Sequence, residues 1–105
     1  MELRQLEYVV AVAEQMHFGR AAQTLSIGQP AVSQQVARLE RELGVRLFDR
    51  SGRTLRLTAA GSRFIPEARA VLAAADHARG VVSDPVVGTA TRPFGSAVAP
   101  DSAND

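Results

Sequence analysis

Side chains that can pair with base edges recur along one face of a helix expected between Ile27 and Gly44. Glutamine can pair with adenine, arginine with guanine, and a small apolar group can contact the thymine methyl. The residues with this chemistry are Gln29, Pro30, Ala31, Ser33, Gln34 and Arg38. This face carries no carboxylate, so the pattern favours a surface that enters a DNA groove. A solvated polar helix face is the alternative interpretation.

The opposite face of the same helix is apolar. Its residues recur at i, i+4, i+7 and i+11 and are Val32, Val36, Leu39 and Leu43. This spacing is typical of an amphipathic helix that packs on a core. Glu40 and Glu42 are expected beside this stripe, away from the polar face.

Two shorter segments are expected to position this helix. A first helix is predicted from about Glu2 to Gln15, and a second from about Arg20 to Ser26 with Gly19 as its N-cap. A tight connection then leads to Gly28, the expected N-cap of the third helix, which ends at Gly44. A short helix, a tight turn and a longer helix form the helix-turn-helix layout.

A small hairpin is predicted after the third helix. Two short runs, residues 46–49 and 54–57, alternate apolar and polar side chains and flank a Ser-Gly turn. We interpret them as a two-stranded wing. The arginines expected to contact the DNA backbone or minor groove are Arg20, Arg50, Arg53 and Arg56. Surface solubility is the alternative for the wing arginines, and a cap or local ion pair is the alternative for Arg20.

A long fourth helix is predicted over residues 59–82, with Thr58 as its N-cap. Pro66 lies inside this helix and is expected either to kink it or to leave a backbone carbonyl without a hydrogen bond. Apolar residues recur there with heptad spacing, which indicates a dimerisation seam. The seam residues are Phe64, Ala68, Val71, Leu72, Ala75 and Ala78. Packing of the same residues within one chain is the alternative.

The composition excludes several classes of function. The 105 residues contain no cysteine, which removes disulfides, thiolate nucleophiles and cysteine-based zinc sites. His17 and His77 lack partners at metal-ligand spacing, and no phosphate-cradling or dinucleotide motif is present. We therefore expect no enzyme, no cofactor and no metal. With no signal peptide and no membrane-length apolar run, the chain is expected to be cytoplasmic and to contact no membrane.

Charge is distributed unevenly along the chain. Between residues 18 and 63, eight arginines stand against three carboxylates, although the whole chain carries only +1. Residues 83–105 are rich in Pro, Gly, Ser and Thr, without periodicity, and are predicted to be a disordered tail. The expected organisation is a mainly α winged helix-turn-helix domain at 1–58, a linker or dimerisation helix at 59–82, and the tail at 83–105.

Over about residues 1–82 the chain closely resembles the DNA-binding region of LysR-type transcriptional regulators. The most specific matches are QPAVSQQ, LERELGVRLFDR and LTAAG. The resemblance implies that Gln29, Pro30, Ser33 and Gln34 face the major groove, and that Arg50 and Arg53 meet the backbone or minor groove. It also implies an antiparallel pairing of residues 59–82 in a dimer, and in the family a proline inside this helix is usual.

Three departures from the family pattern qualify the resemblance. Gly19 and Gly28 replace the usual Ser or Thr, and residues 83–105 do not resemble the start of the family's effector-binding domain. We therefore predict a DNA-binding regulator, a homodimer on double-stranded DNA, without a small-molecule effector site in this chain. The alternatives are a heterodimerisation partner that modulates a full-length relative, and a non-functional truncated fragment.

Overall fold

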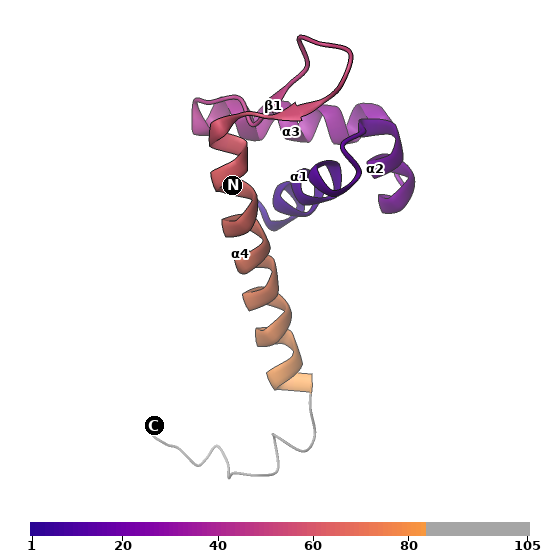
Figure 1. Ribbon diagram of the computed structural model, residues 1–105. Coiled ribbons are helices and arrows are strands. Elements are labelled where there is room, and N and C mark those ends of the chain that lie inside the picture. Colours follow the sequence, from indigo (N-terminus) through magenta and orange to yellow (C-terminus); the bar gives the residue numbers. More distant parts are fainter. Residues whose placement is uncertain (84–105) are drawn as a thin grey trace. The chain divides into compact units, whose positions relative to one another are not determined.

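Three helices and a hairpin precede a long helix within residues 1–83, the part of the chain that the computed structural model describes (Figure 1). The elements in order are α1 (Leu3–Gln15), α2 (Phe18–Leu25), α3 (Gln29–Leu43), β1 (Phe48–Asp49), β2 (Arg56–Leu57) and α4 (Ala59–Ser83). The predicted winged helix-turn-helix followed by a long helix is confirmed. Of the predicted tail 83–105, Ser83 ends α4 and the rest lies outside the described residues.

The core lies between the first three helices and the base of the hairpin. Its fully buried side chains of largest volume are Phe48, Leu6, Leu39, Leu47, Val9, Val12, Val32 and Val36. Three members of the predicted α3 stripe are therefore buried as expected. Leu43 is 37% exposed, because it is the last residue of α3 and its neighbours Glu42, Gly44 and Val45 are also exposed.

The start of α2 differs from the prediction. His17, not Gly19, is the N-cap: its backbone is extended and its Nδ1 accepts a hydrogen bond from the Arg20 amide at 3.0 Å. Phe18 and Gly19 consequently belong to the first turn of the helix. An imidazole nitrogen supplies the acceptor that Ser, Thr, Asp or Asn usually supply at this position.

The connection between α2 and α3 is as tight as predicted. Ser26 adopts the left-handed conformation at φ 59°, and the Ile27 amide donates to the Ala22 carbonyl at 3.0 Å. Gly28 then caps α3, with Pro30 in its first turn, and Gly44 ends the helix at φ 74°. A residue with a positive φ is the usual way to close a helix, so these limits follow from local sequence.

The hairpin is shorter than predicted and packs more deeply. Only Phe48 and Asp49 pair with Leu57 and Arg56, antiparallel, in place of four-residue strands. Leu47 and Phe48 are both buried, although a regular alternating strand would bury only one of two neighbouring side chains.

Glu40 explains how the hairpin is fixed to α3. Its side chain is buried, and Oε2 accepts hydrogen bonds from the amides of Leu47 and Phe48 at 2.8 and 3.2 Å. Arg46 Nε lies 3.5 Å from Oε1. The carboxylate therefore satisfies two buried donors that no strand partner reaches, a role that the helical pattern did not reveal.

The junction between the hairpin and α4 is close-packed. Thr58 caps α4 as predicted: its Oγ1 accepts from the Gly61 amide at 2.9 Å and donates to the Arg46 carbonyl at 2.6 Å. A Cβ atom at Gly61 would overlap the Leu47 carbonyl oxygen, so this contact requires glycine. Pro66 lies inside α4, which runs on as one helix to Ser83.

The first half of α4 belongs to the domain itself. Residues Met1–Leu72 form one compact unit, and Ala73 begins a second. Ile65 and Ala68 are buried in the core, at 5% and 1% exposure, and Phe64 and Leu72 pack against it. Ala68 is thus covered by its own chain and offers no surface for the predicted dimer contact, because the first half of α4 packs on the core.

Candidate nucleic-acid interface

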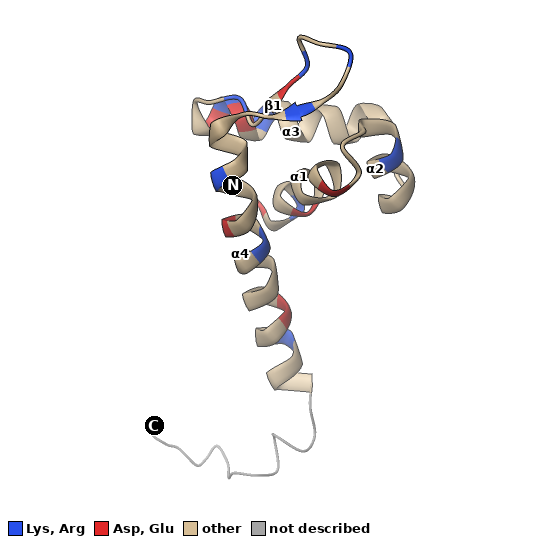
Figure 2. Ribbon diagram, in the orientation of Figure 1, with Lys and Arg blue, Asp and Glu red and all other residues tan. Residues whose placement is uncertain are grey.

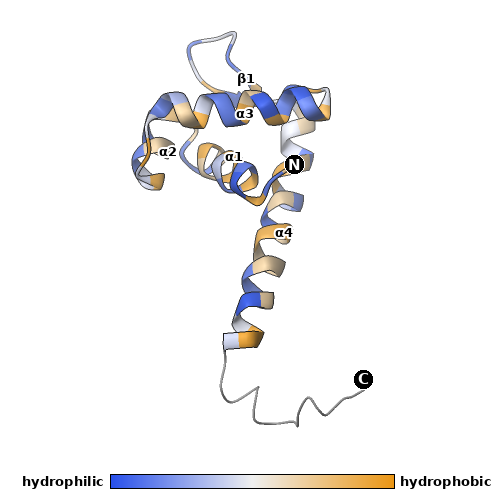
Figure 3. Ribbon diagram, turned by 180° about the vertical axis from the view of Figure 1, so that it is seen from behind, coloured by the Kyte–Doolittle hydropathy of each residue, from blue (hydrophilic) through white to orange (hydrophobic). Residues whose placement is uncertain are grey.

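The predicted polar face of α3 is turned to solvent. Gln29, Pro30, Ala31, Gln34 and Arg38 are exposed, and Ser33 is half-buried. Figure 3 shows hydrophilic and hydrophobic segments alternating along α3, as expected for a helix with one buried side. Behind this face Val32, Val36 and Leu39 are all fully buried. The backbone that carries the exposed donors and acceptors is therefore held firmly by the core.

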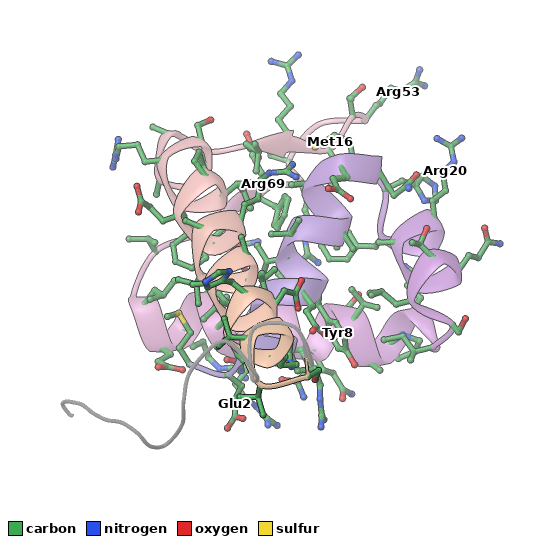
Figure 4. All side chains as sticks on the ribbon, turned by 90° about the horizontal axis from the view of Figure 1, so that it is seen from below. Glu2, Tyr8, Met16, Arg20, Arg53 and Arg69 are labelled. Carbon is green, nitrogen blue, oxygen red and sulfur yellow. The ribbon has the colours of Figure 1, made fainter. Side chains whose placement is uncertain are left out.

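The start of α2 lies beside the start of α3. A Cβ atom on Gly19 would lie 3.0 Å from Cε1 of His17 and 3.4 Å from Oε1 of Gln29. The glycine thus leaves room for the capping imidazole and for the glutamine side chain together. Arg20 follows on α2 and extends away from the fold (Figure 4). The side chain of Gln29 therefore lies beside the start of α2, the helix that carries Arg20.

The wing loop carries the second group of cations. Arg50, Arg53 and Arg56 are all exposed, and Figure 2 shows basic segments along the loop between β1 and β2. Arg53 points outward from the loop in Figure 4. By contrast, the N-terminal half of α3 has neither acidic nor basic residues.

Asp49 shapes the beginning of the wing loop. Its Oδ1 accepts hydrogen bonds from the Ser51 hydroxyl and amide, at 2.7 and 2.9 Å. These two bonds hold the pKa of Asp49 below its ordinary value, and the charges of Arg56 and Arg46 act in the same direction. The one carboxylate of the wing is therefore occupied within the loop.

Arg50 does more than the sequence predicted. Its guanidinium carbon lies 4.3 Å from the centroid of the Phe18 ring, and Phe18 meets Phe48 edge-on at 5.8 Å and 66°. The wing loop is thereby joined to the first residue of α2. Sequence reasoning missed this stack, because the residues come from separate elements and share no periodicity.

A hollow of about 480 Å³ opens between the end of α3 and the wing. Its lining residues are Ala37, Glu40, Arg41, Gly44, Val45, Arg46 and Arg50. Three arginines against one carboxylate, which is itself engaged by the Leu47 and Phe48 amides, make this hollow basic. It extends the cationic surface from the wing towards α3.

The remaining predicted seam residues differ in their exposure. Val71 is 42% exposed and Ala78 is exposed, while Phe64, Leu72 and Ala75 are half-buried. Within residues 1–83, no three His, Cys, Asp or Glu side chains are grouped so as to hold a metal ion. None of the helices described for this chain is both long and apolar enough to cross a membrane.

Comparison with known proteins matches this domain to one family. The model of the bacterial regulatory helix-turn-helix protein, lysR family, matches residues 3–62. The uncharacterized HTH-type transcriptional regulator YnfL of Escherichia coli K12 is 51% identical over 78 residues, covering 74% of this chain and 26% of YnfL. The HTH-type transcriptional regulator ShiR of Corynebacterium glutamicum is 52% identical over 83 residues, covering 79% of this chain and 28% of ShiR. The chain thus spans about a quarter of the length of these relatives.

Solved structures give the same result. The crystal structure of the BenM DNA-binding domain in complex with catB site 1 DNA superposes with a TM-score of 0.76 at 40% identity. The match covers 79% of this chain and 93% of that one. The similarity therefore extends over nearly all of a domain that was crystallised on DNA.

Proposed function

Because the chain belongs to the LysR family of bacterial regulatory helix-turn-helix proteins, we propose that it binds double-stranded DNA sequence-specifically and regulates transcription. The observation that carries this proposal is the exposed, charge-free half of α3, held on a rigid core and flanked by arginines on α2 and the wing. Its relatives YnfL and ShiR are transcriptional regulators, and we place the activity of this chain in the cytoplasm, where bacterial DNA lies.

In this proposal the two kinds of residue have separate tasks. Gln29, Ser33, Gln34 and Arg38 read base edges in the major groove, with Pro30 and Ala31 against apolar groups such as the thymine methyl. Arg20, Arg50, Arg53 and Arg56 contact phosphates or the minor groove and fix the register of α3 on the duplex. All ten side chains except Ser33 are exposed. Support comes from the BenM domain, which has the same fold and was solved on DNA.

We further propose that two chains pair through α4. Val71 is exposed and Leu72 and Ala75 are half-buried, so apolar surface remains on this helix after the core has taken Ile65 and Ala68. Pairing would bring two copies of α3 onto two half-sites. Analytical ultracentrifugation of the chain and of Val71→Asp tests this: the wild type should sediment as a dimer and the variant as a monomer. Monomeric wild-type protein at micromolar concentration contradicts the proposal.

Selection of bound duplexes from random DNA tests the central proposal. We expect enrichment of a defined sequence, as inverted half-sites if the chain pairs. Binding to a selected duplex should weaken with salt by ~0.9 in log affinity per phosphate contact for each unit of log salt concentration. Absence of enrichment together with a flat salt response would refute DNA binding.

A matched pair of arginine variants controls for nonspecific attraction. Arg20→Ala should lower the salt slope by ~0.9, because Arg20 is proposed to contact a phosphate. Arg69→Ala should leave the slope unchanged, because Arg69 is paired with Glu14 at 2.7 Å, and the ion pair joins α4 to α1. Equal effects of the two variants would show that only net charge matters.

A further inference from the structure

Three side chains from different parts of the domain form a continuous stack at the base of the wing. Phe48 of β1 is fully buried, Phe18 at the start of α2 meets it edge-on at 5.8 Å, and Arg50 covers the Phe18 ring at 4.3 Å. Phe48 is further fixed by its pairing with Leu57 and by the hydrogen bond of its amide to Glu40. The outermost member, Arg50, therefore rests on a rigid base.

The contact between Arg50 and Phe18 is a cation–π contact, which does not require the N–H donors of the guanidinium. A guanidinium is planar, and its N–H donors lie in that plane. A cation–π contact attracts the guanidinium to an aromatic ring without occupying these donors. The ring also restricts the rotation of an otherwise flexible side chain, so the donors keep one direction.

The charge of Arg50 is not neutralised by a carboxylate in the described part of the chain. None of the ion pairs found within residues 1–83 includes Arg50. Its sequence neighbour Asp49 is engaged by the hydroxyl and amide of Ser51. An oriented, uncompensated guanidinium of this kind suits bidentate binding of a phosphate. Arg20 follows Phe18 by two residues on α2 and is a second cation close to it in the sequence.

We propose, on the premise that the domain binds DNA as described above, that Phe18 is a positioning residue for phosphate recognition. Its ring holds Arg50 so that the guanidinium edge meets a backbone phosphate between the wing and the start of α2. Arg50 thus acts as an oriented clamp rather than as a mobile charge at the tip of the wing. Arg53, on the same loop, has no such support among the aromatic contacts of residues 1–83.

A double-mutant cycle on the full chain tests this assignment with a random-sequence duplex as the probe. Phe18→Leu keeps an apolar side chain but removes the aromatic face, and should weaken binding by about 2–5-fold, the range expected for an exposed cation–π contact. In the Arg50→Gln background the same change should have no further effect. In the Arg53→Gln background it should keep its full effect, because Arg53 lies outside the stack.

Two further variants separate positioning from packing. Phe18→Tyr retains the ring and should bind like the wild type. Arg50→Lys retains the charge but not the planar edge, and should weaken binding while the salt slope stays close to that of the wild type. Thermal unfolding of each variant shows whether it is folded; if Phe18→Leu does not fold, the Arg50→Lys and Arg50→Gln results decide the question.

The outcomes are distinct. Equal effects of Phe18→Leu in the Arg50→Gln and Arg53→Gln backgrounds would reduce Phe18 to a packing residue and overturn the proposal. Wild-type binding by Arg50→Lys would overturn it as well. If the unmodified chain fails to bind any duplex in a salt-dependent way, the DNA-binding function itself fails, which is a different result from loss of coupling between the two residues.

Discussion

The exposed half of α3 and the wing loop, the two parts of the proposed DNA interface, are built in opposite ways. From Gln29 to Ala37, α3 has no charged residue. Val32 and Val36, on the buried side of this half, are completely inaccessible to solvent. The wing loop from Arg50 to Thr54 is fully exposed, and only two residue pairs join its strands. Reading base edges demands fixed geometry, whereas attraction to phosphates by an unsupported side chain such as Arg53 depends mainly on charge.

The two regions are tied together at two points. Glu40, near the end of α3, holds the amides of Leu47 and Phe48, and the Phe18 ring connects Arg50 to α2. These two attachments hold the base of the wing loop and Arg50 against the helices of the domain. The difference between the regions can therefore be tested by changing the attachment, the reading residues and the loop in turn.

The largest effect is expected from removing the attachment at Glu40. Glu40→Ala leaves two buried amides without an acceptor and should lower the free energy of unfolding by about 3 kcal/mol, from the cost of unsatisfied buried donors. Urea denaturation followed by circular dichroism measures this. Glu42→Ala is the control: Glu42 is exposed and pairs with the amino terminus of Met1, so a change within about 1 kcal/mol is expected. Similar losses in both variants would show that burial of Glu40 contributes nothing.

The next effect concerns reading by α3. Gln34→Ala should reduce discrimination at one base pair of a selected site by ~1–3 kcal/mol, while the salt slope remains that of the wild type. Competition binding against single-base variants of the site measures the discrimination. Gln15→Ala, an exposed glutamine at the end of α1, should leave it unchanged. Unaltered discrimination in Gln34→Ala removes that residue from the readout set.

The wing should show the reverse behaviour. Arg53→Ala should weaken binding to all duplexes alike and lower the salt slope by ~0.9, because one phosphate contact is lost and no base contact is involved. Titrations at several salt concentrations with selected and scrambled duplexes measure both quantities. A loss confined to the selected duplex would assign base reading to the wing and remove the contrast with α3.

The smallest effect is the pH dependence of the wing loop. Because hydrogen bonds from Ser51 lower the pKa of Asp49, the ionised carboxylate stabilises the loop above the unfolded pKa, and this support is lost as pH falls through the folded value. Nuclear magnetic resonance signals of the Ser51 amide should therefore shift at a pH below the ordinary aspartate range. In Asp49→Asn the shift should disappear, since the amide does not titrate. A transition at or above the ordinary aspartate pKa would contradict this account.

The limits of α3 could be read from sequence because they depend on neighbouring residues. Gly28 and Pro30 begin the helix, Gly44 ends it at a positive φ, and the spacing of valine and leucine separates its two faces. The same holds for Thr58 as the cap of α4 and for the presence of a hairpin with an exposed arginine loop. Family membership rests on these local patterns as well, and the match to the lysR family model confirms it.

Tertiary contacts decided what each pattern means in three dimensions. Glu40 is buried because the amides of Leu47 and Phe48 return over it, and Ala68 is buried because the first half of α4 packs on the core. The cap at His17 and the Phe18–Arg50 stack likewise depend on which elements approach one another. Periodicity gives the faces of a helix, but only the folded chain determines which face is covered, and by which residues.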